Sequence, residues 1–210
     1  MTSKLHAAFL DLFEKWNKSI NLSAASTRAE LQEHLADSLH VIPHLRAHLL
    51  DRNDARQNAS QLTPVVNPET AALGAETETP RVLDVGSGGG FPVVIAAIEM
   101  PEVHFTALEP VHKKHAFLRT AARELKLSNL EALARRLDDH DVADYDVAMS
   151  RATFDLAEWL AIGSKRVRPG GLVLGFEAVP RTDLPPATVR HPYALAGKQR
   201  AIVALSVGGS

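Results

Sequence analysis

The sequence predicts an α/β fold in which helices cover both faces of a mostly parallel sheet. From residue 81 onward, short apolar runs typical of strands alternate with helix-like periodicity, and this alternation favours parallel strands joined by crossover helices. Residues 81–92 (Arg-Val-Leu-Asp-Val-Gly-Ser-Gly-Gly-Gly-Phe-Pro) combine a strand, a glycine-rich turn and a helix start. A chain of 210 residues suits one such domain with a small extension.

The individual elements are predicted from periodicity and capping signals. Apolar residues recur at helical spacing over 4–17. A second helix is expected from the N-cap Thr27 to about residue 50, with a kink or restart at Pro43. No element is assigned to the proline-rich residues 180–198. The remaining expected elements are strands over 81–85, 103–108, 130–134, 145–149, 172–177 and 200–207, helices over 91–99, 111–126 and 154–167, and a turn at Pro169-Gly170-Gly171.

Composition divides the chain into three parts. Residues 1–50 form a helical extension, the polar residues 51–80 are expected to be a partly disordered linker or insertion, and residues 81–210 form the ligand-binding domain. The chain has no cysteine, which excludes disulfides and thiolate chemistry, and no metal site is expected. The net charge of −2 argues against a general nucleic-acid coat but is compatible with a local basic patch. No signal peptide or membrane span is apparent, so we expect a cytoplasmic protein.

The glycine segment indicates a site for S-adenosylmethionine (SAM). Gly86, Gly88 and Gly90 would let the backbone approach a nucleotide-like ligand closely. Asp84 would repel a pyrophosphate but suits a cationic ligand with an amino-acid group, which points to SAM rather than NAD. Glu109 ends the next predicted strand, at the spacing of about 20 residues expected for a carboxylate that binds ribose hydroxyls. A solvated surface glutamate is the alternative for Glu109.

Five segments resemble a known family in sequence and in order. They are Lys-Trp-Asn-Lys-Ser-Ile-Asn-Leu-Ser at 15–23, His-Leu-Ala-Asp-Ser-Leu at 34–39, the glycine segment through Phe91-Pro92, Leu-Glu-Pro at 108–110 with Lys113-Lys114 and Phe117-Leu118, and Ser150-Arg151-Ala152. Together they resemble the bacterial 16S rRNA guanine-N7 methyltransferases of the RsmG (GidB) type. The resemblance covers most of the chain apart from residues 51–80 and the loop after residue 180.

The resemblance implies a class I SAM-dependent methyltransferase with a Rossmann-like sheet and an N-terminal helical extension. SAM would be the methyl donor, and N7 of one guanine in the 16S rRNA of the 30S subunit would be the acceptor. We expect a monomer. With the residues of the family's motifs added to the glycine segment, the predicted cofactor site comprises Asp84, Gly86, Ser87, Gly88, Gly90, Phe91, Glu109, Leu137, Asp138 and Arg151.

Particular roles also follow from the resemblance. Leu137 and Asp138 would lie over the adenine, and Arg151 would close the site beside the cofactor. His34 and Asp37, three residues apart on one helix face, would approach the acceptor base or order the loop over the cofactor. The alternative is that the polar face of this helix fastens it to the catalytic domain. The predicted substrate residues are His34, Asp37, Arg151 and Arg200.

The sequence departs from the family's pattern at three places. Val93 replaces a glycine, and Glu177 replaces a lysine where RNA phosphate would be expected. One basic residue near the C-terminus is missing, although Arg200 matches the family's arginine. Two alternatives therefore stay open: a divergent methyltransferase that modifies another RNA or a small molecule, and a SAM-binding module without turnover.

The expected chemistry requires little from side chains. N7 of guanine has a free lone pair and no proton, so its methylation needs no general base, and the protein supplies mainly proximity and alignment. The sequence contains no constellation typical of nucleophilic or paired-carboxylate catalysis, and no catalytic residue is assigned. Among the remaining candidates, Lys165, Arg166 and Arg168 are interpreted as structural and Trp16 as a core residue.

Overall fold

The computed structural model describes residues 3–25, 27–49 and 79–208, so the predicted linker lies almost wholly outside the described residues. Two helices, α1 (Lys4–Ile20) and α2 (Arg28–Leu39), precede the sheet, and a further helical segment covers residues 42–49. The later elements are β1 (Arg81–Val85), α4 (Val93–Glu99), β2 (His104–Leu108), α5 (His112–Glu124), β3 (Leu130–Leu133), η1 (Leu137–Asp139), β4 (Tyr145–Ser150), α6 (Leu156–Gly163), β5 (Val167–Glu177), β6 (Val189–Leu195) and β7 (Lys198–Ser206).

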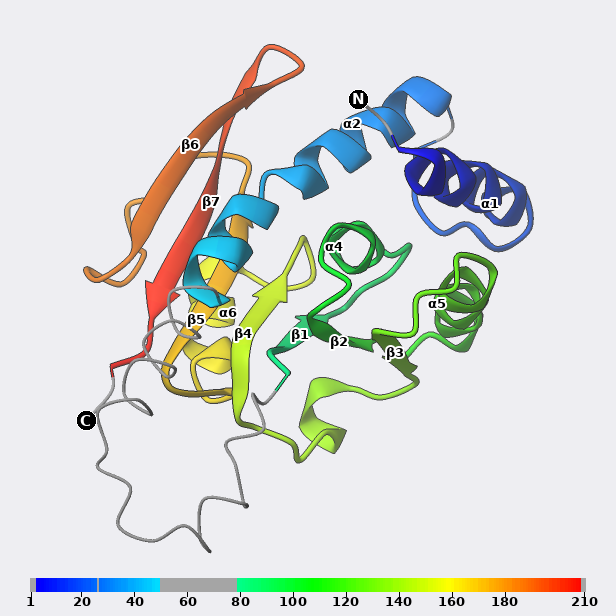
Figure 1. Ribbon diagram of the computed structural model, residues 1–210. Coiled ribbons are helices and arrows are strands. Elements are labelled where there is room, and N and C mark those ends of the chain that lie inside the picture. Colours follow the sequence, from blue (N-terminus) through cyan, green and yellow to red (C-terminus); the bar gives the residue numbers. More distant parts are fainter. Residues whose placement is uncertain (1–2, 26, 50–78, 209–210) are drawn as a thin grey trace, which may run out of the picture.

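One seven-stranded sheet organises the molecule, in the order β3-β2-β1-β4-β5-β7-β6 (Figure 1). The first five strands of this order are parallel, whereas β7 runs antiparallel to β5 and β6 antiparallel to β7. The predicted α/β class with a mostly parallel sheet is therefore confirmed. The strand order reverses between β1 and β4, and ligands of open parallel sheets bind beyond the strand ends at such a point.

The N-terminal helices begin as their sequences predict. The Thr27 side chain accepts a hydrogen bond from the Glu30 backbone N–H, and the Glu30 carboxylate accepts one from the Thr27 backbone. This capping box confirms Thr27 as the predicted N-cap. Helix α2 ends at Leu39 and a new helical segment starts at residue 42, next to Pro43. The predicted interruption is therefore a restart, since proline fits the first turn of a new helix.

Three elements differ from the sequence-based expectation. Helix α6 is shorter than the predicted 154–167. The predicted turn at residues 169–171 lies inside β5, where the pairing with β4 shifts register between Tyr145 and Val147. Strand β6 was not predicted; its Pro192 is tolerated because β6 is the edge strand next to β7 in the sheet formed by the described residues.

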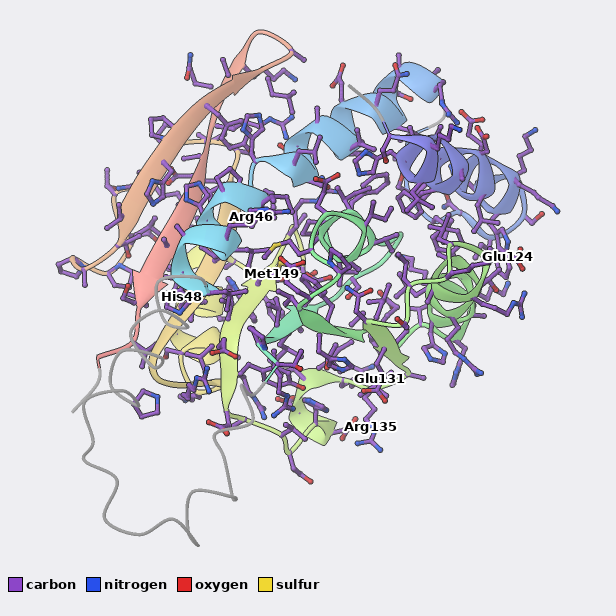
Figure 2. The ribbon with its side chains drawn as sticks, viewed as in Figure 1. Arg46, His48, Glu124, Glu131, Arg135 and Met149 are labelled. Atoms are coloured by element: carbon purple, nitrogen blue, oxygen red, sulfur yellow. The ribbon has the colours of Figure 1, made fainter. Side chains whose placement is uncertain are left out.

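Two apolar cores lie on the two faces of the sheet. Helix α6 and η1 cover one face. Helices α4 and α5 cover the other, and α1, α2 and residues 42–49 share the core of that face. Figure 2 shows Met149 of β4 in the interior, while Glu124 of α5 points outward. None of the described helices is long and apolar enough to cross a bilayer.

An aromatic cluster joins α1 to the sheet-bound helices. The ring of Phe9 lies 5.1 Å from that of Phe91, and the ring of Phe13 lies 5.6 Å from that of Phe117. Trp16 packs at 5.7 Å from Phe117, so its predicted place in the core is confirmed. Because edge-on aromatic pairs add to the gain from burial, this cluster is a main attachment of the N-terminal helices.

Candidate functional site

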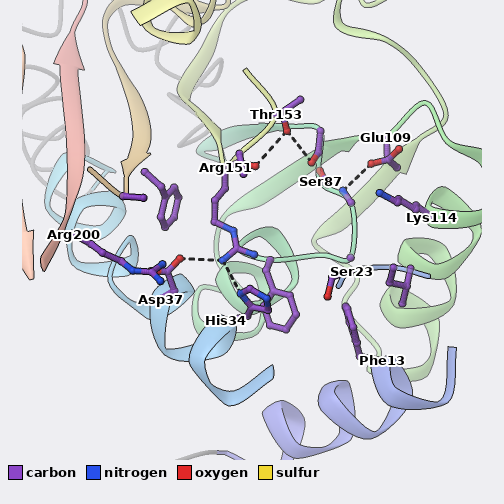
Figure 3. A pocket seen from close by; sticks show the side chains of 18 of the residues that line it. Phe13, Ser23, His34, Asp37, Ser87, Glu109, Lys114, Arg151, Thr153 and Arg200 are labelled. Carbon is purple, nitrogen blue, oxygen red and sulfur yellow. Dashed lines mark hydrogen bonds and ion pairs between the residues drawn. The ribbon is translucent and has the colours of Figure 1, made fainter. Parts of the chain in front are cut away.

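A cavity of about 670 Å³ opens at the carboxyl ends of the parallel strands and is bordered by α1 and α2 (Figure 3). Its volume lies within the range of about 300 to 1,000 Å³ that is usual for cofactor sites. The cavity is lined by Phe13, Leu22, Ser23, His34, Asp37, Gly86, Ser87, Gly88, Gly89, Phe91, Glu109, Pro110, Lys114, Arg151, Ala152, Thr153, Phe176, Glu177, Ala178, Tyr193 and Arg200.

The turn after β1 forms the floor of this cavity. The backbone N–H groups of Gly86 and Ser87 both donate to the Leu108 carbonyl, at 2.9 and 3.1 Å, which anchors the turn to the end of β2. Gly86 has a φ of +73° and Gly88 a φ of +53°, conformations that glycine adopts without steric cost. A Cβ at Gly88 would meet only the Gly86 carbonyl oxygen, at 3.7 Å. The turn at Gly88 therefore leaves room for a ligand to approach the backbone.

Glu109 follows β2 and lies beside this turn. Its carboxylate is buried and accepts two backbone hydrogen bonds, from Gly88 to Oε2 at 2.8 Å and from Val111 to Oε1 at 2.8 Å. Each carboxylate oxygen retains a further acceptor position, so the group can receive ribose hydroxyls while staying in place. A solvated surface glutamate is contradicted, because Glu109 is only 4% exposed.

Asp84 lies at the end of β1, behind the glycine turn rather than on the cavity surface. Its side chain is 1% exposed, and Oδ2 has no hydrogen-bond partner among the described residues. Burial raises the pKa of this carboxyl to about 7, although a hydrogen bond from Ser87 and the charge of Arg151 oppose the shift. Asp84 is therefore the group near the cavity whose charge changes around neutral pH.

The raised pKa of Asp84 predicts a pH dependence of stability. Between its ordinary pKa of 3.8 and about 7, the folded protein binds a proton that the unfolded chain has released. The free energy of unfolding should therefore fall as the pH rises through this interval and level off above it. Relative to Asp84→Asn, the wild type should lose a few kcal/mol between pH 5 and 8, since one pKa unit corresponds to about 1.4 kcal/mol. Urea unfolding of both proteins measures this difference, and a difference that does not vary with pH would contradict it.

Asp37 brings together side chains from four elements (Figure 3). Its Oδ2 accepts a hydrogen bond from Arg151 Nη1 at 3.0 Å. Its Oδ1 accepts from Arg200 Nη1 at 3.0 Å and from the Tyr193 hydroxyl at 2.8 Å. His34, one helical turn earlier, lies with Nδ1 3.5 Å from the same Arg151 nitrogen. All four predicted substrate residues therefore meet at one wall of the cavity.

Burial, and then the neighbouring charges, shift the pKa values of two side chains at this wall. Burial lowers the pKa of His34, and the positive charge of Arg151 lowers it further, so the imidazole is neutral near pH 7. The pKa of Tyr193 is raised, first by burial and then by the Asp37 charge. The Arg151 guanidinium lies 5.7 Å from the centre of the Phe91 ring, within cation–π range. The Tyr193 hydroxyl and the His34 imidazole are thus neutral members of a hydrogen-bond network whose other members are Asp37 and the two arginines.

Besides Asp84, three predicted cofactor residues do not line the cavity within the described part of the chain. Gly90 is packed instead, since a Cβ there would meet Val94 at 2.6 Å and Phe9 at 3.3 Å. Leu137 is buried in the core on the α6 side of the sheet, and Asp138 is exposed on the 3-10 turn η1. A role over the adenine stays a prediction for the last two.

Glu177, which stands where the family has a lysine, is paired within the protein. Its buried carboxylate pairs with Arg190 Nε, at 3.2 Å to Oε1 and 3.0 Å to Oε2, and accepts the Arg181 backbone N–H at 2.9 Å. The negative charge is therefore balanced by a cation from the neighbouring hairpin.

Sequence reasoning missed several residues of the cavity. Tyr193 lies in β6, a segment to which no element was assigned. Thr153 directly follows Ser150-Arg151-Ala152, and its Oγ1 lies 3.3 Å from the Gly86 carbonyl oxygen, so this motif could have been extended to include it. Lys114, to which no role was assigned, also lines the cavity. The structural roles of Arg166 and Arg168 are confirmed by hydrogen bonds from Arg166 to two carbonyls and by an ion pair between Arg168 and Asp146.

The fold and this site together define the class of protein. A parallel sheet carrying a glycine turn after β1 and a buried acid after β2, with its cavity at the switch point, is the arrangement of class I SAM-dependent methyltransferases. A putative O-methyltransferase from Klebsiella pneumoniae has a similar structure, with a TM-score of 0.54 over 96% of this chain and 90% of that chain. At 14% identity, this likeness supports the fold alone.

Sequence comparison gives the family. The model for rRNA small subunit methyltransferase G matches residues 68–183. A ribosomal RNA small subunit methyltransferase G from Albidiferax ferrireducens is 38% identical over 81% of this chain and 69% of its own length, and one from Burkholderia mallei is 37% identical over 81% and 65%. The chain thus spans about two thirds of these relatives' lengths. It belongs to the rRNA small subunit methyltransferase G family, as its motifs predicted.

Proposed function

We propose that this protein transfers a methyl group from SAM to N7 of a guanine in the 16S rRNA of the small ribosomal subunit. The observation that supports this most is the meeting of the family's glycine turn, Glu109 and Arg151 in one cavity at the sheet's switch point. The relatives' names indicate the small-subunit rRNA as the acceptor.

The cavity fits the cofactor on its own geometry. Gly86 and Gly88 present backbone to the cavity floor, and the Glu109 carboxylate stands beside them to accept the ribose hydroxyls. The ionised form of Asp84, behind the turn, favours the positive charge of the ligand. SAM supplies an activated methyl group on a sulfonium centre. Gly88, Glu109 and the wall around Arg151 bind and orient the reactants, so catalysis depends on alignment rather than on proton transfer.

The ion pair between Glu177 and Arg190 makes the cavity compatible with an RNA acceptor. Had the Glu177 charge been unpaired, it would repel a phosphate that enters the cavity. Because Glu177 is paired, the cations that line the cavity are Arg151 and Arg200, which share Asp37, and Lys114. Such groups suit a polyanion. We further propose that the protein acts as a cytoplasmic monomer without a metal.

Methyl transfer from radiolabelled SAM to 30S subunits, naked 16S rRNA and tRNA tests this proposal. We expect label in the 30S or 16S substrate, at a guanine that mass mapping identifies as 7-methylated. Label in tRNA alone would favour the divergent methyltransferase instead. If calorimetry shows binding of SAM and of its demethylated product while no RNA is labelled, the protein is a binding module without turnover.

A further inference from the structure

Asp37 connects the N-terminal helices to the far edge of the sheet. The residue lies on α2, whereas its three hydrogen-bond donors come from the loop after β4, from β6 and from β7. Arg151 and Arg200 each contribute Nη1, and both side chains line the cavity. One carboxylate thus fixes two guanidinium groups at the same wall (Figure 3).

The burial of the Asp37 carboxylate explains why it holds both arginines in place. The Asp37 side chain is 3% exposed, against 18% for Arg151 and 27% for Arg200. A carboxylate buried to this degree requires partners, because an unpaired buried charge is strongly unfavourable. An arginine side chain in turn carries about 2 kcal/mol of rotamer entropy when free. The two ion pairs remove this freedom before any ligand binds, which is a form of preorganisation.

The two arginines keep donors for a ligand. Arg151 uses Nη1 for both Asp37 and His34, and Arg200 uses Nη1 for Asp37. Nε and Nη2 of both side chains have no hydrogen-bond partner among the described residues. Phe91 supports the Arg151 guanidinium from one side. Two guanidinium groups around one carboxylate retain one net positive charge, and their remaining donors match the oxygens of a nucleotide.

We propose that Asp37 is a positioning residue for methyl transfer, which holds Arg151 and Arg200 so that their remaining donors meet the acceptor nucleotide. The inference rests on the proposed function, because the acceptor is taken to be a guanine nucleotide of 16S rRNA. Asp37 acts through the arginines and does not touch the reacting atoms. It also gives α2 a part in the reaction, since this helix supplies the one carboxylate that both arginines share.

The test compares two isosteric substitutions, Asp37→Asn and Asp146→Asn. Asp146 is also buried and paired with an arginine, Arg168, but lies outside the cavity. Both variants should lower Tm. We expect Asp37→Asn to lower kcat on 30S subunits by about 10- to 100-fold, a usual effect of losing a group that orients a ligand-binding side chain, while SAM affinity by calorimetry stays near that of the wild type. Asp146→Asn should keep the wild-type kcat per folded molecule.

A second measurement separates positioning from a general loss of structure. In an Arg200→Ala background, Asp37→Asn should cost less in kcat than it does in the wild-type background, because one of its two targets is already gone. Equal costs in both backgrounds, or equal losses of kcat in Asp37→Asn and Asp146→Asn, would overturn the inference. A wild-type protein that methylates no RNA would instead refute the proposed function, so the two failures are distinguishable.

Discussion

Gly86→Arg is expected to abolish SAM binding in a protein that still folds. Gly86 has a φ of +73°, and a Cβ at this position would overlap the Thr153 side chain across the mouth of the turn. The arginine would therefore displace Thr153 and enter the space in front of the turn, where the backbone must approach the cofactor. Calorimetric titration with SAM should show no measurable binding, and circular dichroism should show the secondary structure of the wild type.

Gly197→Arg is the matched control for this substitution. Gly197 has the same φ of +73°, lies in the exposed turn between β6 and β7, and has no atom within 4 Å of a Cβ built on it. It should lose about 1 to 2 kcal/mol from backbone strain alone and keep the SAM affinity of the wild type. SAM binding by Gly86→Arg at wild-type affinity would refute the placement of the cofactor over this turn.

Arg151→Ala should reduce turnover far more than stability. The substitution removes a guanidinium that lines the cavity beside Phe91, and we expect kcat/KM on 30S subunits to fall by about 100-fold, as for the loss of one preorganised donor in an active site. Asp37 would keep the hydrogen bonds from Arg200 and Tyr193. The free energy of unfolding should accordingly fall by only about 1 to 3 kcal/mol.

Arg168→Ala shows whether that loss of turnover is specific. Arg168 also pairs with a buried aspartate, and its side chain is 13% exposed, close to the 18% of Arg151, but it does not line the cavity. A similar loss of Tm with unchanged kcat/KM is expected. Should the two variants lose turnover in the same proportion, Arg151 would have no role beyond stability. Steady-state kinetics and thermal unfolding on both proteins provide the comparison.

The sequence predicts well those strands that are short apolar runs bounded by turn residues. Strands β1, β2 and β4 are buried apolar runs between turn residues, so their positions agree with prediction to within a residue or so. Strand β6 has no such signal, because it is an edge strand whose residues are exposed or half-buried and include Pro192. The start of β5 was missed for a related reason: glycines that favour a turn lie instead in an irregular part of the strand.

The site residues likewise fall into two groups, those that lie close together in the sequence and those that only the fold brings together. The glycine turn and Glu109 are fixed by short spacings, and the structure places them together. The cluster around Asp37 is a different case, because Arg151 and Arg200 follow it by 114 and 163 residues. Their meeting depends on β7 and β6 being added beyond β5, antiparallel to it and to each other. No local pattern in the sequence specifies that arrangement.

Gly90 has a structural role that its place in the glycine motif does not reveal. It belongs to that motif by sequence, yet the space where its side chain would be is filled by Val94, Leu118 and Phe9 of α1. Its φ of +85° also favours glycine whatever the space. A motif usually taken to mark a ligand site therefore also fixes how α4, α5 and the N-terminal helix α1 pack together.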